Sequence, residues 1–482
     1  MNLLSSASIF SFFTIISRIL GYLRDILIAI FLGASIFADA FFVAFRLPNT
    51  FRRLFAEGTF NAAFIPSYTS AKIKNQKTGK KFADDVLTLI LIILIFIVTL
   101  AEIFTPFLVY LIAPGFIDDD IKFKLAVELT RITFPFLLFV SLSSFFSGVL
   151  NSNNKFAIAA ASPIILNIIL IFSILFSYFQ NLNIAKQLSY GVTIAGILQL
   201  IFLIFFTLKF YKPKIIFFVK ISKKIKFFFK KLIPSILSSG VTQINILVGT
   251  IIASFQSGAV SYLYYADRVY QINLAIAGIA VGTVSLPVLS KAFKSKNFSK
   301  VSNIQNKSIQ LSLLLSIPAS TGLVIAADEI ISGLFGYGSF TLEDVRLTSK
   351  ALMFFGLGVV AFALVKVLSN FFFARDNTKT PFYISSFIVF LNVVISLSLF
   401  NQIGFLIIPI ATSISTWLGV LIFLYCLQKR RHLLLQNKLF NSFFKIIISS
   451  FIMAFVLIVL LDKFSSYLDY AYTYKSVYLL II

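Results

Sequence analysis

Charge is scarce in this sequence. Only 12% of the 482 residues are Asp, Glu, Lys or Arg, whereas 59% are hydrophobic. A soluble protein has roughly half apolar and about a quarter charged residues, so this balance excludes a water-soluble chain. The apolar residues form long runs, such as residues 86–101 and 446–461, and a membrane-spanning helix needs about 20 mostly apolar residues. We therefore predict an all-α polytopic membrane protein, because a helix satisfies its own backbone hydrogen bonds in lipid.

Cysteine and histidine are nearly absent. Cys426 is the only cysteine, which excludes an intrachain disulfide. The only histidine, His432, follows the basic run 429–431, where we expect a solvated loop residue rather than a metal ligand. The sequence has no glycine-rich phosphate loop and no nucleophile near a histidine, and we read the acidic run 118–120 as a solvated loop. It therefore predicts no catalytic residue, no cofactor, no metal site and no ATP-driven transport.

Acidic residues are also few, and the formal net charge is +24. The basic residues gather between apolar runs, so they predict charged loops and no nucleic-acid partner. The richest connection, residues 209–231, holds nine lysines and no acidic residue. Connections rich in Lys and Arg face the cytoplasm, which predicts a cytoplasmic N-terminus. Because phenylalanines alternate with these lysines, the segment is either an amphipathic helix on the anionic leaflet or an orientation signal alone.

Apolar runs separated by polar breaks predict thirteen membrane spans. The last residues, 477–482, look like the start of a fourteenth span, and we expect the chain to be a fragment. The first apolar stretch continues past two arginines and has no basic region before it, so it predicts a membrane helix rather than a signal peptide. The predicted spans lie near residues 9–33, 36–57, 86–112, 125–150, 156–178, 188–208, 232–254, 258–283, 309–335, 347–373, 381–400, 404–427 and 441–461.

Weak internal similarity predicts two homologous halves. Pro66 matches Pro287 at an offset of 221, and Asn167 matches Asn392 at an offset of 225. An even number of spans in each half makes the repeats parallel, with the substrate path between them. We predict two parallel six-helix lobes around a central cavity plus C-terminal helices. The predicted divisions are an N-lobe (1–208), a basic cytoplasmic connection (209–231), a C-lobe (232–428) and a C-terminal helix pair (429–482).

The first two spans carry charges well inside their apolar runs. Span one contains Arg18, Arg24 and Asp25. A charge at the bilayer centre costs about 2.5–3.5 kcal/mol even on a lenient scale, so such residues face a wet cavity or a partner. Arg18 and Asp25 are seven residues apart and therefore lie on nearly the same helix face. This spacing predicts a wide polar face.

Span two repeats the pattern, since acidic and basic side chains interrupt it at seven-residue and four-residue intervals. Two alternatives to substrate binding stay open: the long side chains reach the interface, or static ion pairs join helices. The matching place in the second half carries Asp267 and Arg268. The charged residues of span two are Asp39, Arg46, Arg52, Arg53 and Glu57.

The excess of arginine over carboxylate predicts an anionic cargo. Guanidinium binds phosphate through two parallel hydrogen bonds and keeps its charge in an apolar setting. A diphosphate therefore suits these spans.

Several motifs resemble those of the MurJ (MviN) lipid II flippases of the multidrug/oligosaccharidyl-lipid/polysaccharide exporter superfamily. The similarity covers almost the whole chain, and the span-two motif is the most specific. It rests on residues 17–21 with Arg24-Asp25, the span-two runs 39–49 and 52–58, and then 113–116, 264–268 and 379–381.

The resemblance implies a flippase that moves undecaprenyl-diphosphate-linked disaccharide pentapeptide to the periplasmic leaflet for peptidoglycan synthesis. It implies a place in the bacterial inner membrane and a role in cell wall biogenesis and cell shape. Lipid II and membrane lipids are the implied partners, with cell-wall synthesis proteins as further candidates. By resemblance, the important cavity residues are Arg18, Arg24, Asp39, Arg52, Glu57 and Arg268.

The resemblance further implies alternating access, and we expect Asp39 and Glu57 to pair with the cavity arginines when no cargo is bound. Some family members bind sodium through an acidic residue on the seventh span, whereas residues 233–254 contain no Asp or Glu. A short fourteenth span would remove part of the family's groove for the lipid tail. Alternatives are a flippase for another polyprenyl-linked saccharide, a drug exporter of the same superfamily and, more remotely, a membrane-embedded polyprenyl-phosphate glycosyltransferase.

Overall fold

The regular elements of the computed structural model are helices. It describes residues 3–56, 59–216 and 222–482, and no strand occurs among them. The all-α prediction is confirmed. In chain order the main helices are α1 (Leu3–Leu32), α2 (Ile36–Ala56), α3 (Thr59–Lys74), α4 (Gln76–Ile103), α5 (Thr105–Ile112), α6 (Asp120–Thr133), α7 (Phe136–Ser152), α8 (Phe156–Phe179), α9 (Ile184–Thr207), α10 (Lys223–Ala253), α11 (Ala259–Leu274), α12 (Val281–Lys294), α13 (Phe298–Ile325), α14 (Ala327–Phe335), α15 (Leu342–Phe373), α16 (Lys379–Ile403), α17 (Ile407–Lys429), α18 (Asn437–Lys463), α19 (Ser465–Leu468) and α20 (Lys475–Ile481).

The membrane character of these helices is plain from their length and composition. Within the described ranges, nine stretches are long and apolar enough to cross a bilayer, and one of them, Lys379–Lys429, contains both α16 and α17. Their outer faces carry large apolar side chains; α18, for example, exposes Phe444, Phe451 and Phe455. Such faces are stable in lipid and unstable in water.

Two helices were missed by the sequence prediction. Both α3 and α12 lie in segments that their lysines and an internal proline made look like connections. Proline interrupts a helix by removing one backbone donor, but helix packing can compensate for that loss. Here Phe64 and Leu289, one in each helix, are fully buried. Burial of such apolar faces, rather than local propensity, accounts for these helices.

The order of helices repeats along the chain. α4 and α13 begin 222 residues apart, at Gln76 and Phe298, and α9 and α17 begin 223 apart, at Ile184 and Ile407. By contacts the chain divides into two compact units, Met1–Ser257 and Gly258–Ile482. Helix α10 packs within the first unit, against α3, although the repeat matches it to α1. The lobe boundaries inferred from the sequence stay a prediction.

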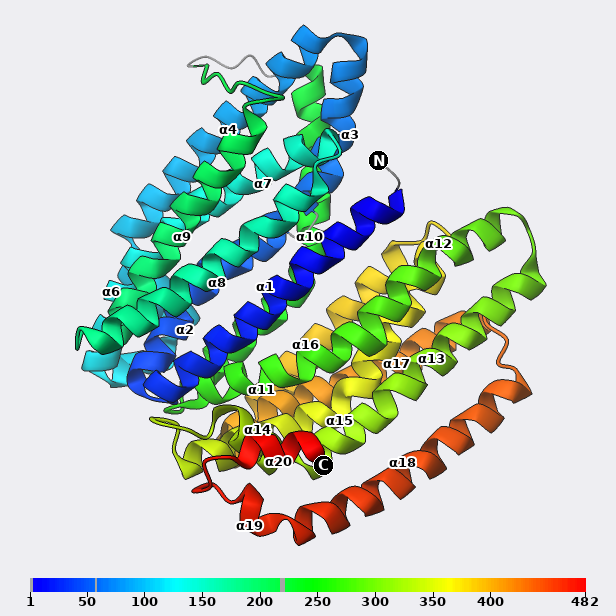
Figure 1. Ribbon diagram of the computed structural model, residues 1–482. Helices are drawn as coiled ribbons and strands as arrows, with labels where there is room; N and C mark the ends of the chain where they lie inside the picture. Colours follow the sequence, from blue (N-terminus) through cyan, green and yellow to red (C-terminus); the bar gives the residue numbers. More distant parts are fainter. Residues whose placement is uncertain (1–2, 57–58, 217–221) are drawn as a thin grey trace. The chain divides into compact units, whose positions relative to one another are not determined.

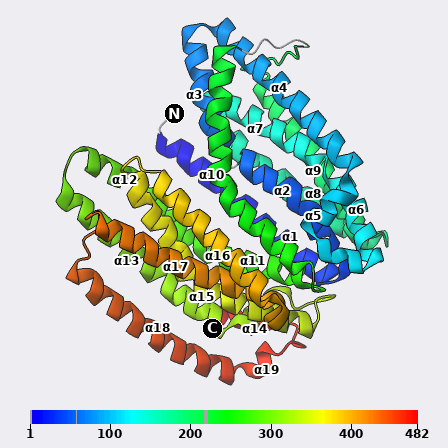
Figure 2. The same cartoon turned by 180° about the vertical axis from the view of Figure 1, so that it is seen from behind.

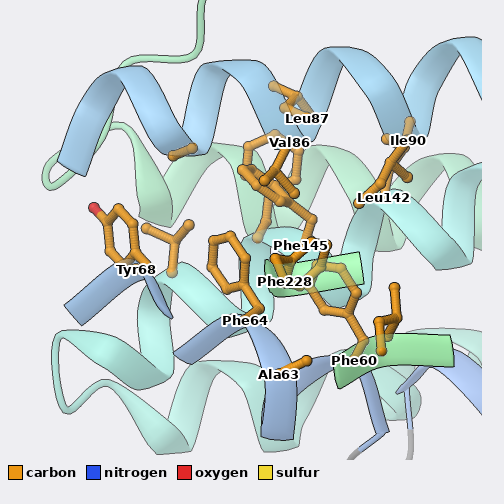
Figure 3. Packing of buried hydrophobic residues seen from close by; sticks show 14 of the residues in the cluster. Phe60, Ala63, Phe64, Tyr68, Val86, Leu87, Ile90, Leu142, Phe145 and Phe228 are labelled. Carbon is orange, nitrogen blue, oxygen red and sulfur yellow. The ribbon is translucent and has the colours of Figure 1, made fainter. Parts of the chain in front are cut away.

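Aromatic side chains fill the core of the first unit. Phe64 stacks on Phe60 and Tyr68, with ring centroids 5.2 and 5.4 Å apart, and lies 5.0 Å from Phe145 of α7 (Figure 3). Phe228 of α10 packs edge-on against Phe60. Burying such rings contributes more than their area alone, by about 0.5–1.5 kcal/mol a pair. This cluster joins α3, α4, α7 and α10.

The lysine-rich connection is tied to α4 by one carboxylate. Tyr211 donates its hydroxyl to Oδ1 of buried Asp84 at 2.6 Å, and the backbone N–H of Lys214 donates to the same oxygen at 3.0 Å. Burial, together with the neighbouring Asp84 carboxylate, raises the pKa of Tyr211 above its ordinary value. The start of the connection is therefore held by specific bonds, whereas residues 217–221 lie outside the described part.

The second unit ends in a short segment that folds back on itself. α18 runs along α13, and α20 packs against α14 (Figures 1 and 2). Lys475, only 1% exposed, donates from Nζ to the carbonyl oxygens of Gly336 and Tyr470 at 2.6 and 2.7 Å. Its ammonium also lies 4.4 Å from the ring centroids of Tyr337 and Tyr470. This lysine fastens the segment beyond α18 to the loop after α14.

The attachment of this segment should depend on pH. Lys475 lies beyond the last candidate span, and burial lowers its pKa from the ordinary 10.5 to about 8. An undocked lysine keeps the higher pKa and binds more protons between these values, so docking should strengthen as pH rises through this window. A spin label at exposed Tyr474 should accordingly become less mobile from pH 7.5 to 10. In Lys475→Met this change should vanish; a variant that keeps it would show that another group titrates.

Candidate functional site

Arg24 and Asp25 form a buried pair on α1. They are 6% and 2% exposed. Arg24 donates from Nε and Nη2 to Asp25 Oδ1 at 3.0 and 2.7 Å, and from Nη1 to Oδ1 of Asn167 at 2.9 Å. Asn167 in turn donates to the carbonyl oxygen of Ser17 at 2.8 Å. The network bonds α1 to α8, which lie side by side (Figure 1).

Arg18 has a different environment from Arg24. Its side chain is exposed, and within the described residues it makes no hydrogen bond or ion pair. A guanidinium has five N–H donors, all of which are available at Arg18. Arg24 uses three of its five on Asp25 and Asn167. The two arginines of α1 therefore differ in what they offer to an anion.

Asp39 pairs with a lysine that the sequence did not single out. Its carboxylate, fully buried at the start of α2, lies 2.6 Å from Nζ of Lys122 in α6. Lys122 is 4% exposed, and its ammonium stands 4.2 Å from the ring centroid of Phe116. The pairing of Asp39 with cavity arginines, expected when no cargo is bound, stays a prediction. The observed pair joins α2 to the first turn of α6.

The remaining charges of α2 lie further along the helix. Arg46, Arg52 and Arg53 are half-buried, and Arg52 donates from Nε to Oδ1 of Asn49 at 2.9 Å. Glu57 lies outside the described residues. The seven-residue spacing of Asp39, Arg46 and Arg53 thus fits one helix face, on which Asp39 is buried and both arginines are half-buried.

Close backbone packing explains the short motif at residues 113–116. The N–H of Gly115 donates to Oγ of Ser254 at 3.0 Å. A Cβ on Gly115 would lie 2.5 Å from the Cα of Phe255, closer than real Cβ atoms approach. Only glycine allows this contact between the α5–α6 connection and the end of α10.

In the second unit, α11 positions Asp267 and Arg268. Arg268 donates from Nη2 to the hydroxyl of Tyr264 at 2.9 Å and lies 4.8 Å from the centroid of that ring. Asp267 accepts a hydrogen bond from the side-chain amide of Gln271. Tyr265 is fully buried and packs against the ring of Phe335. Of these two adjacent tyrosines, Tyr265 therefore anchors the helix and Tyr264 holds the half-buried guanidinium of Arg268.

Sequence reasoning missed two partners of the predicted residues. Asn167 interrupts an apolar run, as the predicted arginines do, so its type and place were a usable signal. Lys122 follows an acidic run in what looked like a loop, and nothing in the sequence marked it as buried. No group of three or more His, Cys, Asp or Glu side chains suited to a metal occurs among the described residues. The site residues described above can therefore recognise an anion through their guanidinium groups.

Comparison with solved structures defines the class of protein. A multidrug resistance MATE family transporter of the MOP superfamily, in an inward-facing conformation, matches with a TM-score of 0.70 and 15% identity over 86% of this chain and 94% of that one. At this identity the match shows the fold alone. The fold is that of a polytopic helical transporter.

More similar proteins identify the family. The family model for lipid II flippase MurJ matches residues 28–478. A MurJ relative from Rickettsia prowazekii (strain Madrid E) is 39% identical over all of this chain and 94% of its own length, and one from Rhizobium tropici is 38% identical over 93% and 85%. A solved lipid II flippase MurJ in an inward closed conformation has a TM-score of 0.84 and 30% identity, covering 98% of this chain and 95% of that one. The chain belongs to the lipid II flippase MurJ family, and it is a transporter rather than an enzyme.

Proposed function

We propose that this chain flips lipid II, the diphosphate-linked peptidoglycan precursor, from the cytoplasmic to the periplasmic leaflet of the bacterial inner membrane. The observation that carries the proposal is the family match over residues 28–478. The basic connection at residues 209–231 supports a cytoplasmic N-terminus. Transport proceeds by alternating access, in which the cargo site opens to one side of the membrane at a time.

The contacts of α1 support different roles for its two arginines. Arg18 is exposed and has all its donors available, so it binds the diphosphate directly. Arg24 is buried and engaged with Asp25 and Asn167; it holds α1 against α8 and keeps two donors for cargo. In the second unit, Tyr264 orients Arg268, which serves as a further diphosphate ligand. Arg46, Arg52 and Arg53 supply positive charge along α2.

Lipid II accessibility in cells tests the proposed function. In a strain depleted of its own lipid II flippase, this chain should restore the fraction of lipid II that a periplasmic enzyme can modify. If the chain accumulates in the membrane and lipid II stays inaccessible, the proposed cargo is wrong. Radiolabelled lipid II distinguishes flipping from synthesis because the total amount is measured in the same sample.

The same assay tests the role of Arg18. We expect Arg18→Gln to lower the rate of flipping at least tenfold, because a hydrogen-bonded charge contributes about 1.5–3 kcal/mol and 1.4 kcal/mol is a factor of ten. The variant should accumulate normally, since Arg18 is exposed. Arg346→Gln is a matched control, because Arg346 is an exposed arginine in the first turns of α15. Equal rates for Arg18→Gln and this control would rule out Arg18 as a cargo ligand.

A further inference from the structure

A groove on the first unit is lined by none of the four residues of the buried pairs Arg24–Asp25 and Asp39–Lys122. It has a volume of about 510 Å³ and is formed by α5, α6 and α9, of which α6 contacts both others (Figure 2). Its lining combines apolar and charged side chains, including Phe123, Val127 and Ile132 beside Lys124, Glu128 and Arg131, with Tyr190 on the α9 side. A cavity lined in this way suits an amphipathic ligand.

Two of the three charged side chains that line the groove form ion pairs within the described part of the chain, and the third, a cation, does not. Lys124 pairs with Asp120 at 2.6 Å, and Glu128 pairs with Lys186 at 2.6 Å. Arg131 is exposed and forms no hydrogen bond or ion pair with any described residue.

Glu102, on α4, is a carboxylate that acts on Arg131 from outside α6. The two side chains influence each other electrostatically without forming an ion pair. Oε1 of Glu102 is buried with no hydrogen-bond partner. The exposed guanidinium of Arg131 is therefore the anion-binding group of the groove, and Glu102 opposes an anion there.

The groove lies in the first half of two candidate membrane spans. Arg131 stands eleven residues after the start of the candidate span Asp120–Ser152, which is about 16 Å along a helix. Tyr190 stands six residues, about 9 Å, into the candidate span Ile184–Thr207. Tyrosine and arginine are the side chains favoured at the level of lipid headgroups. Both positions therefore lie about 8 Å from the middle of their spans, from which a long side chain reaches toward the headgroups.

An exposed apolar stripe leads from the groove into the lipid region. It follows α9 at helical spacing and contains Tyr190, Ile194, Ile197, Ile201 and Phe205, which are 37–64% exposed. A stripe of this kind can hold an acyl chain whose polar end is at Tyr190. The guanidinium of Arg131 and the first residue of the stripe, Tyr190, line the same groove. A phospholipid likewise joins a charged phosphate to acyl chains.

We propose that this groove binds a membrane glycerophospholipid, with the phosphodiester on Arg131 and one acyl chain along the exposed stripe of α9. Guanidinium binds the phosphate oxygens through two parallel hydrogen bonds. The predicted orientation of the chain places this lipid in the periplasmic leaflet.

Lipid binding to the purified full-length chain tests this site. Native mass spectrometry in detergent, with added phosphatidylglycerol as the probe, should show a tightly bound lipid whose affinity falls about tenfold in Arg131→Gln. Arg346→Gln, the matched exposed arginine, should bind lipid as the original chain does. Diacylglycerol, which has the same chains without phosphate, and glycerophosphoglycerol, which has the phosphate without chains, should not compete.

A variant that should tighten lipid binding, rather than weaken it, makes the test more specific. Glu102→Gln removes the carboxylate that opposes the phosphate and should tighten binding several-fold. The proposal is overturned if Arg131→Gln and Arg346→Gln lose lipid equally, or if Arg131→Gln binds unchanged. Competition by glycerophosphoglycerol would identify a site for soluble phosphate esters and would overturn the lipid assignment. Because lipid II is not the probe, these results are independent of the proposed flipping.

Discussion

Lys122→Met should destabilise the first unit by about 3–5 kcal/mol, because it removes the cation from a buried ion pair and keeps the buried anion. Asp39 is fully buried 2.6 Å from the Lys122 ammonium, and methionine fills most of the volume of lysine. The loss is therefore electrostatic rather than a loss of packing. Thermal unfolding of the protein in detergent, followed by the circular dichroism of its helices, measures it.

The double variant Asp39→Asn with Lys122→Met provides the control. Neutralising both partners removes the uncompensated charge, so the double variant should recover at least half of the lost stability. We also expect it to regain lipid II flipping, because the pair joins α2 to α6 and neither side chain is exposed. A double variant as unstable as Lys122→Met would show that the lysine acts through something other than Asp39. A stable but inactive double variant would assign Asp39 to transport itself.

The class of fold was predictable because hydrophobicity dominates this sequence. Long apolar runs define the bounds of α8 to within one residue and those of α9 to within four, since a membrane helix depends on composition more than on its neighbours. α3 and α12 were missed for the opposite reason. They carry lysines and a proline, and only the apolar contacts made by residues such as Phe64 and Leu289 show that they are helical.

The candidate site was predictable as a set of charges but not as a set of contacts. Burial of Arg24, Asp25 and Asp39 follows from their positions inside apolar runs. Helical periodicity says which residues share a face, but it does not say which helix that face meets. Asp39 pairs with Lys122, which lies 83 residues further along the chain. Arg24 donates to Asn167, which lies 143 residues further along.

Arg24→Ala should abolish lipid II flipping and also destabilise the first unit by about 3–5 kcal/mol. It removes the guanidinium that pairs with the Asp25 carboxylate, which is 2% exposed, and removes the bond from α1 to Asn167. Arg24→Lys keeps the charge, but an ammonium cannot reproduce the planar set of donors that reaches Asp25 and Asn167 together. It should recover most of the stability and little of the flipping.

Asn167→Ala separates the two effects of Arg24. It removes the contact with α8 while the pair of Arg24 and Asp25 stays intact, so it should lower stability by about 1–3 kcal/mol, the cost of an unmade buried hydrogen bond. If Arg24 acts in transport only by holding α1 on α8, flipping should fall in Asn167→Ala as far as in Arg24→Lys. If its two remaining donors also reach the diphosphate, Asn167→Ala should flip lipid II faster than Arg24→Lys at equal amounts of protein. We expect the second result, because the donors of Arg24 that stay available lie on the same helix as the exposed guanidinium of Arg18.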